Sequence, residues 1–361
     1  MMRSHPPPLR VVALGGGTGL PVVLQGLKRA LFPPDWPPPR GRDCLTAVVT
    51  VADDGGSSGR LRRAYRVLAP GDARNCLLAL SEGDGPMAAL FRFRFGGDAE
   101  VGGHSLGNLI LTGLSEVEGD LARATERAGH MLAARGRVLV ATKEDVRLAA
   151  LYEDGTEIVG ESAIAAAGRP IRRVRLVPEG AAAPAEVVAA IQAADLVVIG
   201  PGSLYTSLMP VLLAQGLVPA IAASQARVVL VMNLMTEPGE TDDYTAADHV
   251  QAIRRHVPGL PLHDVLCNEA PLGEERIRRY SMERAAPVTL DLEALAALAC
   301  RIVRRDLAAE GDKVRHDPGK LAAAILESGA GVGGRVVEPH PEGAARSGED
   351  VPMRARGSGT S

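Results

Sequence analysis

The sequence predicts an α/β protein with a doubly wound, mostly parallel sheet and a small antiparallel excursion. Short apolar segments rich in valine, isoleucine and leucine alternate with amphipathic helical segments over most of the chain. Several of the apolar segments lead directly into a glycine-rich turn that is followed by a helical segment. Buried parallel strands joined by crossover helices produce this pattern. The chain shows no repeat of solenoid period, which excludes a stacked-repeat architecture.

The first strand and turn lie in residues 9–20, LRVVALGGGTGL, and a helix is predicted over residues 22–32. Glycine allows a close backbone approach to an anion, and a helix start offers free N–H groups and the positive end of its dipole. The alternative is a turn that serves packing alone. Leu20 replaces the third glycine of the dinucleotide fingerprint, so NAD or another dinucleotide is a lesser possibility as ligand. The ligand-binding candidates in this turn are Gly16, Gly17, Thr18 and Gly19.

An acidic, glycine-rich turn follows the strand predicted over residues 45–51. Asp53 and Asp54 stand at the strand end, where carboxylates can accept ribose hydroxyls, hold Mg²⁺ together with phosphate oxygens, or act as a base. The alternative is that they start a turn and cap the next helix. Ser57 adds a hydroxyl to the same turn. We therefore take these three residues as ligand-binding candidates, and the two aspartates also as the candidate Mg²⁺ ligands.

Polar residues that are candidates for ligand binding also lie near the N-termini of two further predicted helices. A helix capped by Asp72 carries Asn75, and its N-terminus can meet an anion. Another helix is predicted within residues 102–119, with His104 and Asn108 four residues apart on one face. Imidazole and amide groups can both donate and accept hydrogen bonds around a sugar or a pyrophosphate. The alternatives are a solvated helix end for Asn75 and a helix cap for His104.

The middle of the chain, residues 143–178, changes to shorter alternating segments with a hairpin turn at Asp154 and Gly155, which predicts the antiparallel excursion. After a strand at residues 137–142, parallel strands resume at residues 195–200 and 228–233. Each of these two strands is followed by a polar loop, GPGS and NLMTEPGET. The loops add the ligand-binding candidates Gly200, Gly202, Ser203, Asn233 and Thr236.

The later segments are predicted as a helix over residues 246–256, a strand over 264–268, a short strand over 288–291 and then helices, the last in PGKLAAAILES. Loops that leave the carboxyl ends of parallel strands gather at one edge of a doubly wound sheet, where ligands bind. Four polar loops of this chain follow predicted strands: GGGTG, DDGGSSG, GPGS and NLMTEPGET. The sequence therefore predicts a ligand cleft at that edge.

The composition narrows the classes of partner. The formal net charge is −3 and aromatic residues make up 3% of the 361 residues, so the chain has neither a basic field nor stacking surfaces for nucleic acid. Four cysteines without a paired motif indicate reduced thiols, and no apolar run reaches the roughly 18 residues of a membrane span. We expect a cytoplasmic protein without a signal peptide. Residues 1–8 and 329–361 are predicted as a disordered leader and tail, and residues 33–40 as a proline-rich linker.

Familiar catalytic motifs are absent from the sequence. There is no Ser-His-Asp order, no G-x-S-x-G elbow and no Walker lysine. Acyl transfer and ordinary ATP hydrolysis are therefore not supported. A ligand-binding protein without catalysis and an enzyme that uses the carboxylates of Asp53 and Asp54 both remain open at this point.

Taken in chain order, the loops form a series of motifs: GGGTGL, TVADDGGSSGRLR, APGDARNCLLALS, LFRFRF, GHSLGNL, GPGSLYTSLMPVLL, NLMTEPGET and VRHDP. The series resembles the bacterial gluconeogenesis factor (YvcK-type) branch of the family that includes 2-phospho-L-lactate transferase (CofD-like). The resemblance covers about residues 9–326. It implies a Rossmann-like fold for a nucleotide-sugar-binding domain of residues 9–328, with residues 143–178 as its antiparallel insertion, in a cytoplasmic protein.

The resemblance also implies a function. The branch is expected to bind UDP-N-acetylglucosamine and to regulate cell-envelope precursor supply and cell shape during growth on gluconeogenic carbon. Carried over by motif, Tyr280 in RRYSMERAAPV and Arg315 in VRHDP resemble the tyrosine and arginine of the family at the uridine side of the ligand. A tyrosine ring can stack on uracil, and a guanidinium can reach carbonyl or phosphate oxygens.

Three further expectations accompany this interpretation. A protein partner in the cell-envelope precursor pathway and a homo-oligomer are expected as macromolecular partners. No cofactor beyond Mg²⁺ is expected. The alternative function is an Mg²⁺-dependent transferase of the 2-phospho-L-lactate type that uses a nucleotide-linked donor, in which Asp53 and Asp54 hold the metal as catalytic residues.

Overall fold

Two sheets organise the computed structural model, which describes residues 9–32, 41–97, 99–298 and 300–329. The main sheet has seven strands in the order β10-β9-β8-β7-β1-β2-β3, and every neighbouring pair is parallel. Its strands are β1 (Val11–Gly15), β2 (Leu45–Val49), β3 (Arg137–Val140), β7 (Leu196–Ile199), β8 (Arg227–Val231), β9 (Asp264–Asn268) and β10 (Arg301–Arg305). This sheet confirms the predicted fold class.

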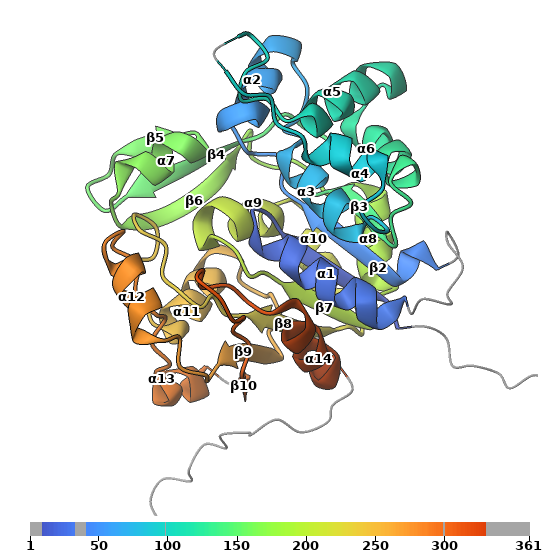
Figure 1. The fold of residues 1–361 in the computed structure, drawn as a ribbon. Coiled ribbons are helices and arrows are strands. Elements are labelled where there is room, and N and C mark those ends of the chain that lie inside the picture. The colour runs from blue at the N-terminus through green and yellow to red at the C-terminus, as the bar shows by residue number, and fades with distance from the viewer. Residues whose placement is uncertain (1–8, 33–40, 98, 299, 330–361) are drawn as a thin grey trace, which may run out of the picture.

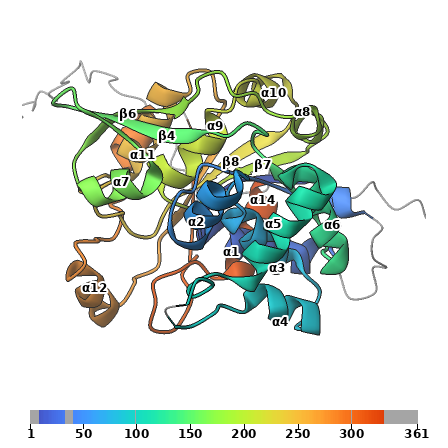
Figure 2. The ribbon, with the colours of Figure 1, turned by 90° about the horizontal axis from the view of Figure 1, so that it is seen from above.

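Helices cover both faces of the main sheet, because its central strands are apolar on both faces. In β1, Val12 and Leu14 belong to one core cluster, whereas Val11 and Ala13 belong to the other. Figure 1 and Figure 2 show the two helical layers on either side of the sheet. One layer contains α1 (Gly19–Leu31), α3 (Gly71–Leu80) and α14 (Pro318–Gly329), and the other contains α8 (Ala185–Gln192), α10 (Leu217–Ala223) and α11 (Ala246–His256).

The predicted antiparallel excursion is a three-stranded sheet in the order β5-β4-β6. It consists of β4 (Arg147–Tyr152), β5 (Glu157–Val159), α7 (Glu161–Ala167) and β6 (Ile171–Val177). The hairpin turns at Asp154 and Gly155, as expected. The Val174 N–H on β6 donates to Nε2 of His256 on α11 over 3.0 Å, which ties the small sheet to a helix of the main fold.

The other helices of the described residues are η1 (Arg42–Cys44), α2 (Gly56–Tyr65), α4 (Pro86–Arg92), α5 (Leu106–Glu118), α6 (Leu121–Met131), η2 (Leu204–Leu208), α9 (Met209–Leu212), α12 (Glu274–Ser281) and α13 (Leu292–Ala297). None of the helices in the described residues is long and apolar enough to cross a membrane.

Strand order changes direction at β1. From β1 the chain first builds outward through β2 and β3, and after the small sheet it returns to the other side of β1 with β7, β8, β9 and β10. The loops that follow β8, β7, β1 and β2 therefore leave four adjacent strands at their carboxyl ends. Open α/β sheets bind ligands at such a switch point. The placement of the four polar loops agrees with the sequence prediction.

Two predicted elements are wrong. Residues 288–291 do not form a strand of a sheet, because Thr289 makes only an isolated bridge with Thr245. The last strand is instead β10, Arg301–Arg305, in a segment where helices were predicted. Its three arginines hide the apolar pattern, since only Ile302 and Val303 are buried. The predicted leader, the linker at residues 33–40 and residues 330–361 of the predicted tail lie outside the described residues.

Candidate functional site

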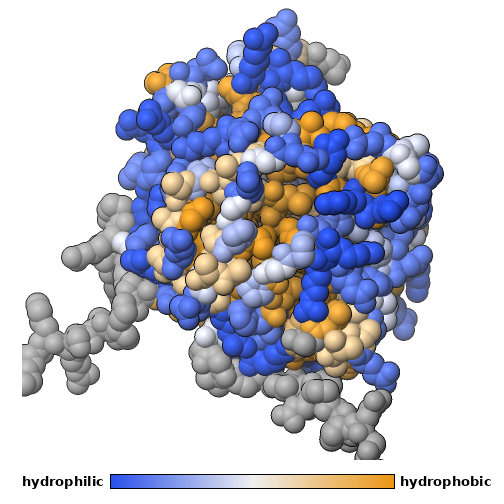
Figure 3. Space-filling model, turned by 180° about the vertical axis from the view of Figure 1, so that it is seen from behind, coloured by the Kyte–Doolittle hydropathy of each residue, from blue (hydrophilic) through white to orange (hydrophobic). Residues whose placement is uncertain are grey.

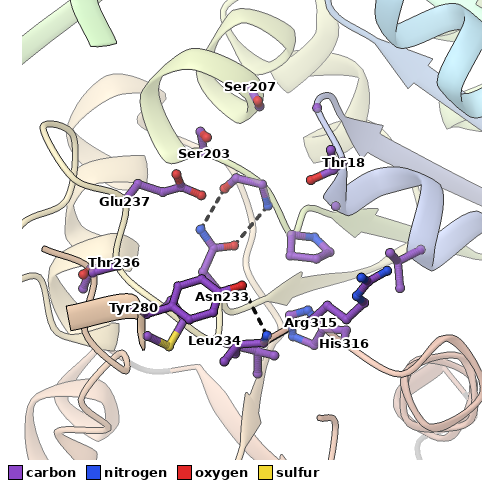
Figure 4. A pocket seen from close by; sticks show the side chains of 18 of the residues that line it. Thr18, Ser203, Ser207, Asn233, Leu234, Thr236, Glu237, Tyr280, Arg315 and His316 are labelled. Atoms are coloured by element: carbon purple, nitrogen blue, oxygen red, sulfur yellow. Dashed lines mark hydrogen bonds between the residues drawn. The ribbon is translucent and has the colours of Figure 1, made fainter. Parts of the chain in front are cut away.

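A cleft of about 290 Å³ lies at the carboxyl ends of β1, β7 and β8, at the switch point of the sheet. Figure 4 shows polar side chains from well-separated parts of the chain around it. Nine of the predicted ligand-binding residues line the cleft: Gly17, Thr18, Gly19, Gly202, Ser203, Asn233, Thr236, Tyr280 and Arg315. Lining residues that the sequence did not single out include Ser207, Glu237, Glu283 and His316.

The glycine turn after β1 forms one wall. Gly17 has φ +62°, in the left-handed region that glycine adopts without strain. A Cβ at Gly19 would lie 2.2 Å from the Pro201 carbonyl oxygen, so the turns after β1 and β7 touch backbone to backbone. Thr18 is the N-cap of α1, but its side chain makes no capping hydrogen bond. Its hydroxyl and the first N–H groups of α1 are therefore available to an anion.

The loops after β7 and β8 form the second wall. The Gly202 N–H donates to Oδ1 of Asn233 over 3.0 Å, and Nδ2 of Asn233 donates to the Gly202 carbonyl over 2.9 Å (Figure 4). This pair of hydrogen bonds joins the two loops. Burial raises the pKa of Glu237, and a hydrogen bond with Ser203 partly opposes that rise. The wall thus contributes hydroxyl and amide groups together with a carboxyl group that is easier to protonate than usual.

The third wall comes from the C-terminal part of the chain. Oγ1 of Thr236 accepts a hydrogen bond from the Ala286 N–H over 3.0 Å. This bond holds the segment that carries α12 against the cleft. Tyr280 on α12 lines the cleft, and its hydroxyl accepts the Val314 N–H over 3.2 Å. Arg315 and His316 follow directly. The structure therefore brings Tyr280 and Arg315 to the same cleft as the glycine turn.

His316 is buried at this wall. Burial lowers its pKa to about 4, against a smaller opposite effect of a hydrogen bond with the Met232 backbone. Its Nε2 has no hydrogen-bond partner among the described residues. The imidazole is therefore neutral at pH 7. The motif VRHDP predicts a site role only for Arg315, because burial of the adjacent histidine depends on the tertiary fold.

The two predicted aspartates have different environments. Asp54 Oδ1 accepts the Ser162 N–H over 2.9 Å at the start of α7, and its Oδ2 lies 4.0 Å from Arg147. Asp54 thus fastens the small sheet to the main fold. Asp53 accepts the Gly55 N–H over 2.8 Å within the turn. Its second oxygen faces Gly71 at the start of α3.

Asp72 is the carboxylate that contacts the glycine turn. Its Oδ1 accepts the Gly17 N–H over 2.9 Å, and its Oδ2 packs against Gly16. It is the second residue of α3, so the prediction that it caps this helix from outside is wrong. Burial first, and the neighbouring charge of Asp53 second, raise the pKa of Asp72 to about 7.

Asp53 and Asp72 repel each other, since the charge of Asp53 contributes to the raised pKa of Asp72. If Mg²⁺ binds here, these two carboxylates would hold it, because Asp54 already bonds to Ser162. Glu161 on α7 lies nearby and is protonated at pH 7, since burial and then the charges of Asp53 and Asp72 raise its pKa to about 9. No group of three or more metal-ligating side chains is assembled within the residues that the structure describes.

The remaining predicted residues lie outside the lining of the cleft. Ser57 Oγ lies 3.0 Å from Nδ1 of His104 and accepts from Nδ2 of Asn108 over 3.1 Å. His104 precedes α5 instead of lying on it, so the prediction of a shared helix face is wrong, although both residues meet at Ser57. Asn75 Oδ1 accepts from Nη2 of Arg74 over 2.6 Å. Gly16 and Gly200 stand behind the cleft wall, where they pack against neighbouring loops and strands.

Fold and site together define a Rossmann-like α/β protein with a small-molecule cleft at its switch point. A family model described as 2-phospho-L-lactate transferase CofD matches residues 11–308. The chain belongs to this family.

Similar proteins carry a further name. A gluconeogenesis factor of Halalkalibacterium halodurans is 45% identical over 88% of this chain and 95% of its own length. The gluconeogenesis factor of Bacillus subtilis is 42% identical over 88% of this chain and 97% of its own length. A crystal structure of a UPF0052 family member from Bacillus halodurans superposes with a TM-score of 0.82 at 44% identity, covering 88% of this chain and 99% of that one. The resemblance inferred from the motifs is confirmed.

Proposed function

We propose that the protein binds UDP-N-acetylglucosamine in the switch-point cleft and acts as a cytoplasmic regulator of cell-envelope precursor supply and cell shape during gluconeogenic growth. The name gluconeogenesis factor, carried by relatives at 42–45% identity, supports the physiological part. Its protein partner would belong to the same precursor pathway. No catalytic nucleophile is required for this role.

One observation carries the proposal. Residues from five separate segments of the chain line one cleft with the donor types that a nucleoside diphosphate needs. The turn around Thr18 opens on the N-terminus of α1, which suits the diphosphate. Tyr280 and Arg315 lie on the opposite wall, where an aromatic ring and a guanidinium suit the uracil and its carbonyl oxygens (Figure 4).

Isothermal titration calorimetry with UDP-N-acetylglucosamine, UDP, GDP and NAD, each with and without Mg²⁺, tests this function. We expect the UDP compounds to bind more tightly than GDP or NAD. Tyr280→Leu and Arg315→Gln should each weaken UDP binding by about tenfold or more, the loss of about 1.4 kcal/mol or more. The exposed neighbour Arg279→Gln is the matched control and should bind like the original protein. Absence of binding by every UDP compound would overturn the proposal.

A transferase of the family type is the second candidate function, and the carboxylate pair favours it. Asp53 and Asp72 lie beside the glycine turn, where a bound Mg²⁺ would neutralise a diphosphate as a nucleotide leaves. Incubation with a lactyl diphospho-nucleotide and a deazaflavin acceptor tests this candidate. Metal-dependent product formation that Asp53→Asn abolishes would replace the regulator as the main function. Ligand binding without product supports the regulator.

Self-association is a further part of the proposal. Figure 3 shows apolar residues gathered in the middle of the face opposite to that of Figure 1, with charged residues around them. Contiguous apolar surface bordered by polar residues is typical of contact surfaces between proteins. Analytical ultracentrifugation at micromolar concentration checks the expectation, and a monomer at every concentration contradicts it.

A further inference from the structure

Three helix N-termini converge beside Asp53 and Asp72. Ser57 in the first turn of α2 bonds to Asn108 in the first turn of α5, and Ser58 Oγ packs against Gly71 at the start of α3. None of the three helices has a side-chain capping hydrogen bond at its N-terminus. Their positive dipole ends and free N–H groups therefore point into one region, which we call the α2–α3–α5 junction.

Three arginines stand around this junction without a carboxylate partner. Arg60 donates to the Gly102 carbonyl over 2.6 Å, and Arg94 donates to the Gly103 carbonyl over 2.7 Å. Arg74, in the first turn of α3, donates to Asn75. No ion pair within 4.0 Å links any of the three to an acidic side chain of the described residues, although charge attraction reaches Arg74 from Asp72 and Asp53. Three guanidiniums against two carboxylates leave a net positive charge here.

The side chains lie close together, because the Arg60 guanidinium packs against Gly103 and the Arg74 side chain packs against Gly107 in the first turn of α5. Burial and then the charge of Arg94 lower the pKa of Arg74. Burial and then the charges of Arg60 and Arg94 lower the pKa of His104. Because His104 is neutral at pH 7, either its Nδ1 or the Ser57 hydroxyl donates the hydrogen in their 3.0 Å hydrogen bond, and the other group accepts it.

Buried polar atoms at the junction lack partners. Asn108 is only 2% exposed, and its Oδ1 has no hydrogen bond. The Nε of Arg74 is also buried without a partner. If the Asn108 amide is rotated by half a turn, its oxygen accepts from Ser57 and its NH₂ group becomes the free donor. Each unpartnered buried group is unfavourable by about 1–3 kcal/mol, so a ligand that accepts these hydrogens stabilises the fold.

We propose that the α2–α3–α5 junction is a second ligand site, which binds an oxyanion separately from the switch-point cleft. Arg74 and Asn108 donate hydrogen bonds to it, while Arg60, Arg94 and the three helix dipoles supply positive potential. The chemical class is a phosphate or a carboxylate, either free or attached to a small molecule. The site goes beyond the proposed function, because no part of the nucleotide sugar is needed to fill it.

Phosphorus NMR line broadening with inorganic phosphate and calorimetry with acetate test the proposal and distinguish the two anions. We expect saturable binding of at least one of them to the full-length protein. Arg74→Met should weaken that binding tenfold or more. Arg123→Met is the matched control, because Arg123 lies on α6 and contacts only its own helix and the preceding turn. If Arg74→Met does not fold, the double variant Arg60→Met with Arg94→Met takes its place and should show a comparable loss.

Variants of the cleft separate this proposal from the nucleotide-sugar function. Arg315→Gln should retain anion binding in full even though it is expected to lose UDP affinity. Conversely, Arg74→Met should bind UDP like the original protein in phosphate-free buffer. The proposal is overturned if neither anion binds saturably, if Arg74→Met binds as tightly as the original protein, or if Arg315→Gln loses the anion.

Discussion

The side-chain amide of Asn233 pairs with both backbone groups of Gly202 and so extends the contact between β7 and β8 beyond the ends of the two strands. The pairing holds Ser203 and the other groups of the loop in a fixed position relative to the glycine turn after β1.

Asn233→Asp tests the importance of this pairing. A carboxylate cannot donate to the Gly202 carbonyl and repels it, so the loop after β7 loses its fixed position. We expect UDP affinity to fall by about tenfold and the free energy of unfolding to fall by about 1–3 kcal/mol. Calorimetry and urea unfolding measure the two quantities. Unchanged affinity in Asn233→Asp would show that the loop does not depend on the amide.

Asp72→Asn should separate stability from function. The pKa of Asp72 in the folded protein, about 7, lies above its ordinary value of 3.8, so the folded state keeps a proton that the unfolded chain loses between these pH values. Its stabilisation is present below about pH 4 and is lost as the pH rises to about 7. Asparagine has no proton to lose and can still accept the Gly17 N–H.

We therefore expect Asp72→Asn to be more stable than the original protein at pH 8, by a few kcal/mol at about 1.4 kcal/mol per pKa unit. At pH 4 the difference should vanish. Any Mg²⁺-dependent increase in ligand affinity should be lost, because one of the two carboxylates is gone. Urea unfolding at several pH values measures the first effect. A variant that is less stable than the original protein at pH 8 contradicts the assignment.

His316→Gln should change the pH dependence in the opposite direction. The pKa of His316 is lowered to about 4, below its ordinary value of 6.5, so the unfolded chain takes up a proton first as the pH falls. The contribution of a neutral buried His316 is complete above about pH 6.5 and is lost as the pH falls to about 4. Replacement by glutamine should flatten the decrease in stability over this range. Parallel stability curves of the two proteins would rule out this role.

Asp264→Ala should affect stability alone. Asp264 is fully buried at the start of β9, and each of its oxygens accepts hydrogen bonds from both Arg227 and Arg301 over 2.7–2.9 Å. Although burial by itself raises its pKa, the two arginines lower it overall. Removing the carboxylate leaves two cations facing each other between β8 and β10.

We expect Asp264→Ala to lose about 3–5 kcal/mol of unfolding free energy at pH 7. The original protein should lose the same contribution only as the pH falls below about 4, since the folded pKa lies under the ordinary value. Asp264 stands at the amino end of its strand, away from the cleft, so the UDP affinity of folded Asp264→Ala should be unchanged. An equal loss of affinity and stability would mean that the two ends of the sheet are coupled.

The elements that the sequence predicted well are those whose pattern is local. The helix over Ala246–His256 and the strand over Asp264–Asn268 match their predicted bounds, because a Thr245 capping box starts the first and an apolar run defines the second. β10 was missed because its arginines hide the apolar pattern, and two of them pair with carboxylates of other elements, Arg301 with Asp264 and Arg305 with Glu327. Such pairing depends on tertiary contacts and leaves no periodic signal.

The residues of the candidate site could likewise be predicted where the signal is local, and not where it depends on tertiary contacts. Loops that follow strands could be assigned to one edge of the sheet, and Thr18, Ser203 and Asn233 line the cleft there. Tyr280 could be predicted as a site residue only through a family resemblance, since α12 has no buried residue and its sequence is typical of a surface helix. The role of Asp72 depends on a contact with Gly17, 55 residues earlier in the chain. Sequence spacing cannot reveal that contact.

The position of the cleft has a consequence for synthesis of the protein. β1 pairs with β2 early, but its other edge stays unpaired until β7 leaves the ribosome after the entire antiparallel insertion. The cleft spans that last junction, so a nascent chain cannot bind ligand until both halves have joined. A ligand that binds as proposed, with contacts to Thr18 on one side and Asn233 on the other, would hold the junction closed and stabilise the joined protein by mass action.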